Sequence, residues 1–230
     1  LRIVQSSGEA KMQHDVGSVI LTPSGEQVAA ALSGTRGLDG EAMSESFIAI
    51  PVFQFESFEQ HSDYNDDSLD MVQDIAYSRD TEIARRAMNK ALRSEPYGDK
   101  GQYTMQWVHC LNLILLIDSG PLAGELAVWT YNKGDFQFGK NLNSLLMRRG
   151  TNLWYNRVQH WGVGRQNDKN AWIALAYANP GGQDLSAPEN YVAADRMAEL
   201  DALHAEVARQ FDTGVMRMTE PDAEVKQTAE

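Results

Sequence analysis

The most apolar stretch of the chain reads Gln106-Trp-Val-His-Cys-Leu-Asn-Leu-Ile-Leu-Leu-Ile117, and the turn-forming residues Asp118-Ser-Gly-Pro121 follow it directly. Its length and the flanking turn residues favour a buried strand over a helix. Residues 125–131 have the composition of a second strand, so we expect the two segments to pair as a hairpin.

Downstream of this hairpin the pattern changes from strand to helix and back again. Residues 136–149 follow helical spacing, and Gly150 is a natural end for that helix. Residues 153–163 return to a period of two, and residues 171–178 form a further apolar run after a polar turn. The sequence therefore predicts a helix followed by two more strands.

Upstream of the hairpin the sequence predicts two strands, an acidic segment and a helix. Residues 16–22 favour a short strand, and residues 47–55 favour a longer one, which Pro51 places at a sheet edge or a bulge. Residues 56–80 contain eight acids and one base, and we expect them to form a solvated loop. A calcium-binding loop is the sharper alternative, but the segment lacks the spaced ligands, central glycine and closing glutamate of an EF-hand. A helix is expected over residues 80–94.

The C-terminal part of the sequence predicts one helix and a tail. Ser186-Ala-Pro-Glu189 matches a capping box with proline in the first turn, and an apolar stripe then extends to about Phe211. We expect residues 1–182 to form one domain, residues 183–214 a C-terminal helix, and residues 215–230 a disordered acidic tail.

The formal net charge of −12 argues against a nucleic-acid partner, because affinity for phosphate backbones comes mainly from lysine and arginine. The charge is unevenly distributed, however. Residues 130–172 contain seven basic and two acidic side chains, which gives this segment a net charge of +5. A basic stretch therefore lies inside an acidic chain.

The order of the expected elements predicts an α+β fold. A first strand, a long insertion, two hairpin strands, a helix and two further strands follow one another between residues 47 and 178. Five strands with a helix between the third and the fourth are the plan of an OB-fold, a barrel that binds single strands on one face and through its loops. We expect a five-stranded OB-like antiparallel barrel with a long insertion between strands 1 and 2 and a C-terminal helix.

Two groups of short stretches have a family resemblance. The first group is Leu1-Arg-Ile-Val-Gln-Ser-Ser7, Gly17-Ser-Val-Ile-Leu-Thr-Pro-Ser-Gly25 and Phe47-Ile-Ala-Ile-Pro-Val52. The second group is Val128-Trp-Thr-Tyr131, Phe138-Gly-Lys-Asn-Leu-Asn-Ser-Leu-Leu146 and Leu153-Trp-Tyr155. Over most of residues 1–178 the chain resembles bacteriophage single-stranded DNA-binding proteins with OB-folds. The resemblance implies binding and protection of single-stranded DNA during phage DNA replication or recombination in the host cytoplasm, and an acidic tail that recruits replication or recombination proteins.

Single-strand binding without sequence readout needs cations that follow the phosphates and flat side chains that stack on the bases. The basic stretch supplies both, and alternation in the expected strand 153–163 places Tyr155, Arg157 and Trp161 on one face. Aromatic side chains in strands are more often part of a core, so each of them has a structural alternative. The predicted DNA-binding residues are Lys133, Lys140, Arg148, Arg149, Tyr155, Arg157, Trp161, Arg165 and Lys169.

Two other functions remain open from the sequence. A phage structural or partner-binding protein would use helix 190–211 to dock on a neighbouring chain. More remotely, Asp118-Ser119-Gly120 resembles the active-site run of aspartic proteases, which need two carboxylates that share a proton. The helix predicted after the hairpin does not suit the flap of such an enzyme, and we expect no enzymatic activity.

The remaining sequence features argue against several classes of protein: metal- or cofactor-dependent, disulfide-rich and membrane-spanning ones. The histidines are scattered, and no zinc, Walker A or complete dinucleotide-binding motif occurs, so we expect no metal and no cofactor. The single cysteine, Cys110, excludes an internal disulfide framework and fits a reducing cytoplasm. No apolar run approaches about 18 residues, so no membrane span is expected. Homo-oligomerisation stays open.

Overall fold

The computed structural model describes residues 2–3, 19–21, 24, 26–32, 39–63, 65–66, 68–69, 72–166 and 171–215. The chain divides into two compact units. The first unit takes residues 1–53, 113–129 and 141–217, and the second takes residues 54–112, 130–140 and 218–230. Helices and antiparallel strands both occur, so the mixed α+β class is confirmed.

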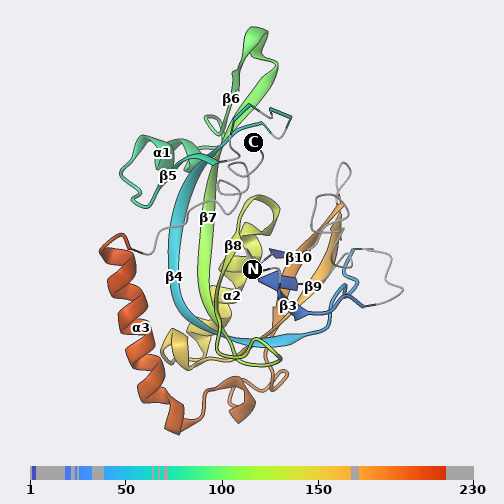
Figure 1. The fold of residues 1–230 in the computed structure, drawn as a ribbon, viewed down its shortest axis with the longest axis vertical. Helices are drawn as coiled ribbons and strands as arrows, with labels where there is room; N and C mark the ends of the chain where they lie inside the picture. The colour runs from blue at the N-terminus through green and yellow to red at the C-terminus, as the bar shows by residue number, and fades with distance from the viewer. Residues whose placement is uncertain are drawn as a thin grey trace. The chain divides into compact units, whose positions relative to one another are not determined.

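A seven-stranded sheet contains all five of the strands expected for the barrel (Figure 1). Its order is β10-β9-β4-β7-β6, with β5 paired to β4 and β8 paired to β7. The pairing of β7 with β8 confirms the predicted hairpin. The strands are β4 (Phe47–His61), β5 (Val72–Ala76), β6 (Ser94–Tyr97), β7 (Tyr103–Ile117), β8 (Leu126–Tyr131), β9 (Val158–Gln166) and β10 (Ala171–Ala178).

A three-stranded sheet in the first unit is formed by β1 (Arg2–Ile3), β2 (Val19–Leu21) and β3 (Glu26–Ala29). The described helices are α1 (Glu82–Met88), α2 (Phe136–Arg148) and α3 (Met197–Asp212). Single turns of 3-10 helix are η2 (Asp99–Gly101), η3 (Lys133–Asp135), η4 (Leu153–Tyr155), η5 (Pro188–Asn190) and η6 (Ala194–Arg196). None of the described helices has both the length and the apolar character needed to cross a membrane.

The predicted solvated loop over residues 56–80 is wrong in part. β4 continues to His61, and a second strand, β5, begins at Val72. Glu59 is buried because Ser57 donates a 2.8 Å hydrogen bond to one of its carboxylate oxygens and Nε2 of His61 lies 2.7 Å from the other. A carboxylate that is paired in this way can be buried inside a sheet, although its sequence neighbourhood is acidic.

The helix α1 is shorter than the predicted helix over residues 80–94. Thr81 caps its start, since the Thr81 side chain accepts a hydrogen bond from the backbone N–H of Ala84. At Asn89 the backbone becomes extended, which ends the helix.

The segment before β9 is a turn, so the strand predicted from residue 153 is wrong at its start. The side-chain amide of Asn156 donates to the carbonyl oxygens of Asn152 and Leu153, at 2.7 and 3.1 Å, which closes the 3-10 turn η4. β9 begins at Val158 and then extends beyond the predicted end at residue 163. The alternation predicted from residue 153 therefore holds only from Val158 onward.

The C-terminal helix is present, but it starts later than the capping box predicts. The backbone N–H and the hydroxyl of Ser186 both donate to the Asp184 carboxylate, at 2.9 and 2.7 Å, so the Ser186 side chain does not cap the helix. Two 3-10 turns then precede α3, which begins at Met197.

The apolar side of α3 packs within the first unit. Leu200 and Val207 are buried, and Nδ1 of His204 lies 2.9 Å from the carbonyl oxygen of Val52 in β4. The ring of Phe211 lies 5.4 Å from that of Phe53. The stripe on which the partner-docking alternative depended is thus used within the chain. Of the predicted tail, only residue 215 lies within the described residues.

Candidate nucleic-acid interface

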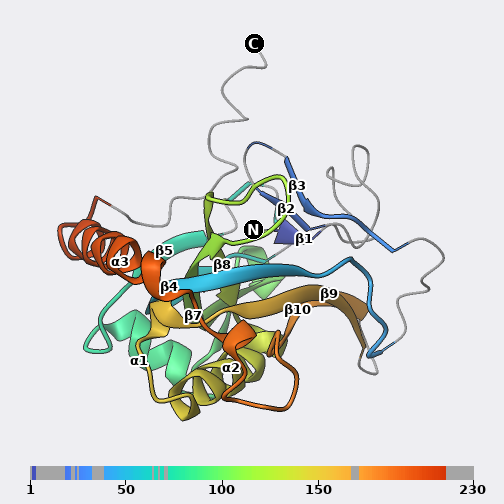
Figure 2. The ribbon, with the colours of Figure 1, turned by 90° about the horizontal axis from the view of Figure 1, so that it is seen from below.

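β9 and β10 of the first unit lie side by side as a hairpin (Figure 2). Their register places two tryptophans and an arginine on one face. In the antiparallel register Arg165 lies opposite Trp172, and Trp161 lies opposite Ala176. Because side chains alternate along a strand, Trp161 and Arg165 project to the same side of β9. We call Trp161, Val163, Arg165 and Trp172 the tryptophan face.

The two indoles of the tryptophan face are only partly buried. They pack against a small apolar cluster of Val163, Ala174 and Ala176, whose side chains are inaccessible to solvent. An aromatic ring that is anchored on one side and exposed on the other is suited to stack on a ligand with its open side.

Arg165 provides the positive charge of this face. About a quarter of its side chain, 25%, is exposed, and its Nη1 lies 3.8 Å from a carboxylate oxygen of Asp39. A surface ion pair of this kind contributes only about 0–1 kcal/mol. The pair with Asp39 is therefore weak.

The opposite face of β9 holds the hairpin in place. His160 is fully buried and its ring stacks on Phe47 at a centroid distance of 5.5 Å. Burial lowers the pKa of His160 to about 4, so the ring is neutral at pH 7. Beyond its pairing with β4, the backbone of β9 is also hydrogen-bonded to residues 41–43, because the N–H of Gly164 donates to the carbonyl oxygen of Glu41 and the N–H of Met43 donates to that of Gly162.

Arg157 is bound within the protein. Its Nε donates a 2.8 Å hydrogen bond to Asp118, whose other carboxylate oxygen accepts from Arg196. The Asp118 side chain is only 8% exposed. Arg157 is thus paired within the protein. It does not lie between Tyr155 and Trp161 on one strand, because Tyr155 belongs to η4 and Trp161 to β9.

The contacts of Asp118 also test the aspartic-protease alternative. An aspartic protease needs a carboxylate that shares a proton with a second carboxylate. Asp118 accepts hydrogen bonds from two guanidinium groups instead. The surroundings of Asp118 are therefore not those that an aspartic protease needs.

Arg149, a predicted phosphate contact, is buried and bonded within the protein. Its guanidinium nitrogens donate to the carbonyl oxygens of Arg157 and Asn190 and to the side-chain oxygens of Asn156 and Asn179. Burial lowers its pKa, because an enclosed cation loses hydration. Its role is to connect the start of β9 to the segment that leads to α3.

Tyr155 also has a structural role. It lies in η4, and its hydroxyl donates to Asp201 of α3 at 2.6 Å. The indole N–H of Trp154 donates to the same oxygen at 2.7 Å. The Trp154 ring stacks on His204 at 3.5 Å. This cluster fastens α3, and Tyr155 does not belong to the tryptophan face.

The remaining predicted residues are dispersed. Lys133 and Lys140 belong to the second unit, where the Lys140 ammonium lies 5.9 Å from the ring centre of Phe136. Arg148 is exposed at the end of α2 in the first unit. Lys169 lies outside the described residues. Of the nine predicted residues, the structure thus brings Trp161 and Arg165 together on one face.

Trp172 lies on the tryptophan face but is not among the predicted DNA-binding residues. The sequence contained information that could have predicted its position. The polar turn between the two predicted strands indicates a hairpin, and in that hairpin residue 172 lies opposite residue 165. The partner of Asp118, Arg196, had no such signal, since it lies 78 positions away in the sequence.

The acidic segment does not form a cation site within the part of the chain that the structure describes. No group of three His, Cys, Asp or Glu side chains is placed there to hold a metal ion. The carboxylate of Asp63 accepts hydrogen bonds from Asn65 and from the backbone of Thr104. The carboxylate of Asp66 accepts from Ser68 and Tyr97. These oxygens are used by the protein, so the calcium alternative is not supported.

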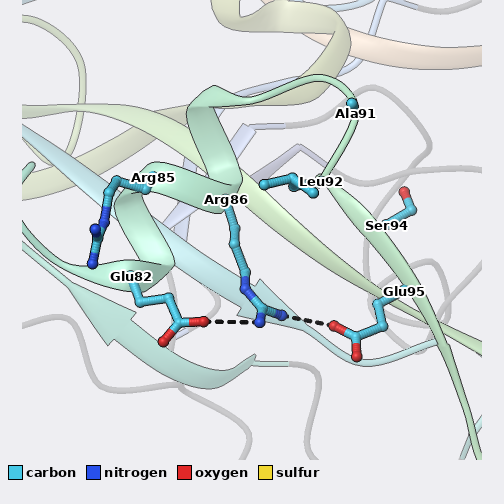
Figure 3. A pocket seen from close by; sticks show the side chains of 7 residues that line it. All are labelled: Glu82, Arg85, Arg86, Ala91, Leu92, Ser94 and Glu95. Atoms are coloured by element: carbon cyan, nitrogen blue, oxygen red, sulfur yellow. Dashed lines mark hydrogen bonds and ion pairs between the residues drawn. The ribbon is translucent and has the colours of Figure 1, made fainter.

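The second unit contains an open pocket of about 490 Å³ between α1 and β6 (Figure 3). Figure 3 shows Arg86 between Glu82 and Glu95, with nitrogen–oxygen distances of 2.8 and 2.7 Å. Arg85 points away from this pair. The charges that line this pocket are largely satisfied by one another.

Comparison with known proteins finds no match among family models, curated proteins or solved structures.

Proposed function

We propose that this protein is a non-enzymatic binder of single-stranded DNA and that the tryptophan face contacts the strand. The observation that supports this most directly is the position of Arg165 opposite Trp172, with Trp161 on the same face. A cation beside partly exposed aromatic rings is the combination that single-strand binding requires. Each base stacked on such a ring contributes about 1–3 kcal/mol.

The spacing on the face suits an extended strand. Trp161 and Arg165 are four residues apart, which corresponds to about 13 Å along a strand. Trp172 lies beside Arg165, so the two indoles are separated by a similar distance. Stacked bases repeat at about 3.4 Å, so the two rings would contact different bases.

The topology supports an OB-like fold as part of the same proposal. Leaving aside β5 and β6, the sheet order is β10-β9-β4-β7-β8. In order of appearance these strands are the fifth, fourth, first, second and third. The last four form the 4-1-2-3 arrangement of a Greek key, and α2 lies between the third and fourth strands. The OB-fold is a five-stranded, partly open Greek-key barrel of this kind.

The biological setting proposed is phage DNA replication or recombination. It depends on the resemblance of residues 1–178 to phage single-stranded DNA-binding proteins. The acidic residues of the predicted tail, 215–230, are proposed to contact replication or recombination proteins.

Fluorescence titration with oligo-dT tests the proposed contact residues. Trp161→Ala and Trp172→Ala should each weaken binding by roughly tenfold, because each removes about 1–3 kcal/mol of stacking. Trp154→Phe is the matched control, since Trp154 donates a hydrogen bond to Asp201 and stacks on His204. Its affinity should stay within about twofold of the wild type.

The melting temperature of each variant separates the proposal from a structural role. Trp161→Ala and Trp172→Ala should leave the fold intact, with a modest loss of packing on the apolar cluster. No binding by the wild-type protein at low salt, or equal affinity in the Trp161→Ala and Trp154→Phe variants, contradicts the proposal.

A further inference from the structure

A basic segment of the second unit has no role in the proposed DNA interface. Residues 83–94, which include most of α1 and the turn after it, contain four cations and no acid. Every residue from Met88 to Glu95 is exposed. The second half of this segment is therefore a continuous part of the protein surface.

Arg86 neutralises the two acids that flank this segment. Its guanidinium nitrogens lie 2.8 Å from Glu82 and 2.7 Å from Glu95 (Figure 3). The guanidinium also lies 4.8 Å from the ring centre of Trp107, which helps to fix its position. Both flanking carboxylates are thus occupied by Arg86, and the other three cations of the segment are left without them.

These other three cations, Arg85, Lys90 and Arg93, are exposed and form no ion pair with the described residues. The two arginines donate to the backbone carbonyl oxygens of Thr81 and Ala87, at 3.4 and 3.3 Å. In a chain with a net charge of −12, three neighbouring cations without a carboxylate stand out from the general excess of acid. They make this surface locally attractive to a negatively charged partner.

Two bulky apolar side chains are exposed among these cations. Met88 is 42% exposed and Leu92 is 53% exposed. Leu92 lines the same hollow as Arg85, and Met88 lines another hollow together with Arg93. Arg85 and Met88 are also three residues apart on α1, and side chains at this spacing are neighbours on a helix. Each apolar side chain therefore lies beside a cation.

The turn after α1 is held by hydrogen bonds to Asn89. Its carbonyl oxygen accepts from the backbone N–H of Leu92, and its side-chain oxygen accepts from that of Ala91, both at 3.0 Å. The three cations and the two apolar side chains thus belong to one short, locally ordered stretch of the chain. We call these five residues the basic–apolar surface: Arg85, Met88, Lys90, Leu92 and Arg93.

We infer that the basic–apolar surface binds a protein segment in which acidic residues are interspersed with aliphatic ones. The cations contact the carboxylates of that segment, and its aliphatic side chains cover Met88 and Leu92. A nucleic-acid strand fits this surface less well, because bases stack on exposed aromatic rings. None of the five residues is aromatic, and Trp107 beside them is only 3% exposed. The inference does not depend on the tryptophan face.

Fluorescence anisotropy of the full chain tests this surface with a labelled peptide of glutamates interspersed with leucines. One comparison peptide has serine in place of every leucine, and another has glutamine in place of every glutamate. The glutamate–leucine peptide should bind about tenfold more tightly than either of them, because it alone offers both carboxylates and apolar surface. Added salt should weaken its binding, since the ion pairs are exposed.

Two sets of substitutions assign the binding to these residues. The triple variant Arg85→Gln, Lys90→Gln and Arg93→Gln should weaken binding of the glutamate–leucine peptide roughly tenfold, because each exposed ion pair contributes up to about 1 kcal/mol, or a factor of about five. Leu92→Ser should weaken it by about fivefold, because roughly half of the leucine side chain is left for a partner to cover.

Two control variants separate this role from a general effect of charge or folding. Met147→Ser combined with Arg148→Gln removes an exposed apolar side chain and an exposed cation from α2, and it should stay within about twofold of the wild type. Arg85→Lys combined with Arg93→Lys keeps both charges, so it should also bind the peptide like the wild type. All variants should melt close to the wild type, because the substituted side chains are exposed.

Four results overturn the inference. Two of them are equal affinity for the three peptides and wild-type affinity in the triple variant. A shallower salt slope for oligo-dT in the triple variant assigns the surface to nucleic acid, and self-association that Leu92→Ser abolishes assigns it to a second copy of the chain. A protein that binds oligo-dT but not the peptide refutes the basic–apolar surface alone, and the reverse result refutes the tryptophan face alone.

Discussion

His160 is a buried titratable residue on the inner face of β9. It is fully enclosed, stacked on Phe47, and its pKa is lowered to about 4 from an ordinary value of 6.5. Between these two pH values the unfolded chain binds a proton that the folded chain does not. Stability must therefore fall as the pH decreases from 6.5 towards 4, by about 3 kcal/mol from this residue.

Urea unfolding at pH 7 and pH 4.5 measures this loss. His160→Phe removes the titration while keeping an aromatic ring against Phe47, so its free energy of unfolding should change less between the two pH values. Burial also lowers the pKa of His109, which adds to the slope in both proteins. Identical pH dependence in the wild type and His160→Phe would falsify the assignment.

Asp118 connects three elements of the first unit. It follows β7 directly, Arg157 precedes β9, and Arg196 ends η6 just before α3. Hydrogen bonds to charged groups contribute about 1.5–3 kcal/mol each, and partial exposure of the two arginines reduces that figure. Asp118→Asn should therefore lower the free energy of unfolding by about 2 kcal/mol.

Asp195→Asn is the matched control for this substitution. Asp195 is an exposed acid beside Arg196 in the same 3-10 turn, so its replacement removes one negative charge from the surface without breaking the connection. Chemical denaturation should place Asp195→Asn close to the wild type. Equal stability of both variants would mean that Asp118 does not hold the three elements together.

The periodicity of apolar residues predicted those strands and helices whose apolar side chains are buried. β7 and β10 are enclosed apolar strands, and α2 has a clear apolar stripe, so each lies close to its expected bounds. The elements that were missed depend on specific side-chain bonds. η4 is closed by the Asn156 amide, and Ser186 bonds to Asp184 instead of capping α3. Such bonds join particular partners, and periodicity does not specify the partner.

The candidate site could also be predicted only in part, because the sequence pattern does not specify the partners of its side chains. The basic stretch predicted the correct segment, since Trp161 and Arg165 lie on one face of β9. It could not separate exposed cations from structural ones, because burial of Arg149 and pairing of Arg157 depend on residues far away in the sequence. Lys133 and Lys140 were predicted to lie on the same surface as Arg165 because they are close to it in the sequence. They belong to the second unit, whereas Arg165 belongs to the first.

At the scale of the whole molecule, the net charge of −12 opposes the approach of any polyanion. Binding must then depend on a small number of local contacts, and the structure leaves Arg165 as the cation of the tryptophan face. Each phosphate neutralised on a single strand adds about 0.7 to the slope of log affinity against log salt. With one to three such contacts, the slope should lie between about −0.7 and −2.

A salt series of oligo-dT titrations checks this slope and the residue responsible for it. Arg165→Gln should make the slope shallower by about 0.7, because it removes one phosphate contact. Arg209→Gln, an exposed arginine paired with Glu206 on α3, should leave the slope unchanged. Trp161→Ala should weaken binding at every salt concentration while keeping the wild-type slope, since stacking releases no counterions. A steep slope that is insensitive to Arg165→Gln would show that other cations dominate, and it would move the interface away from the tryptophan face.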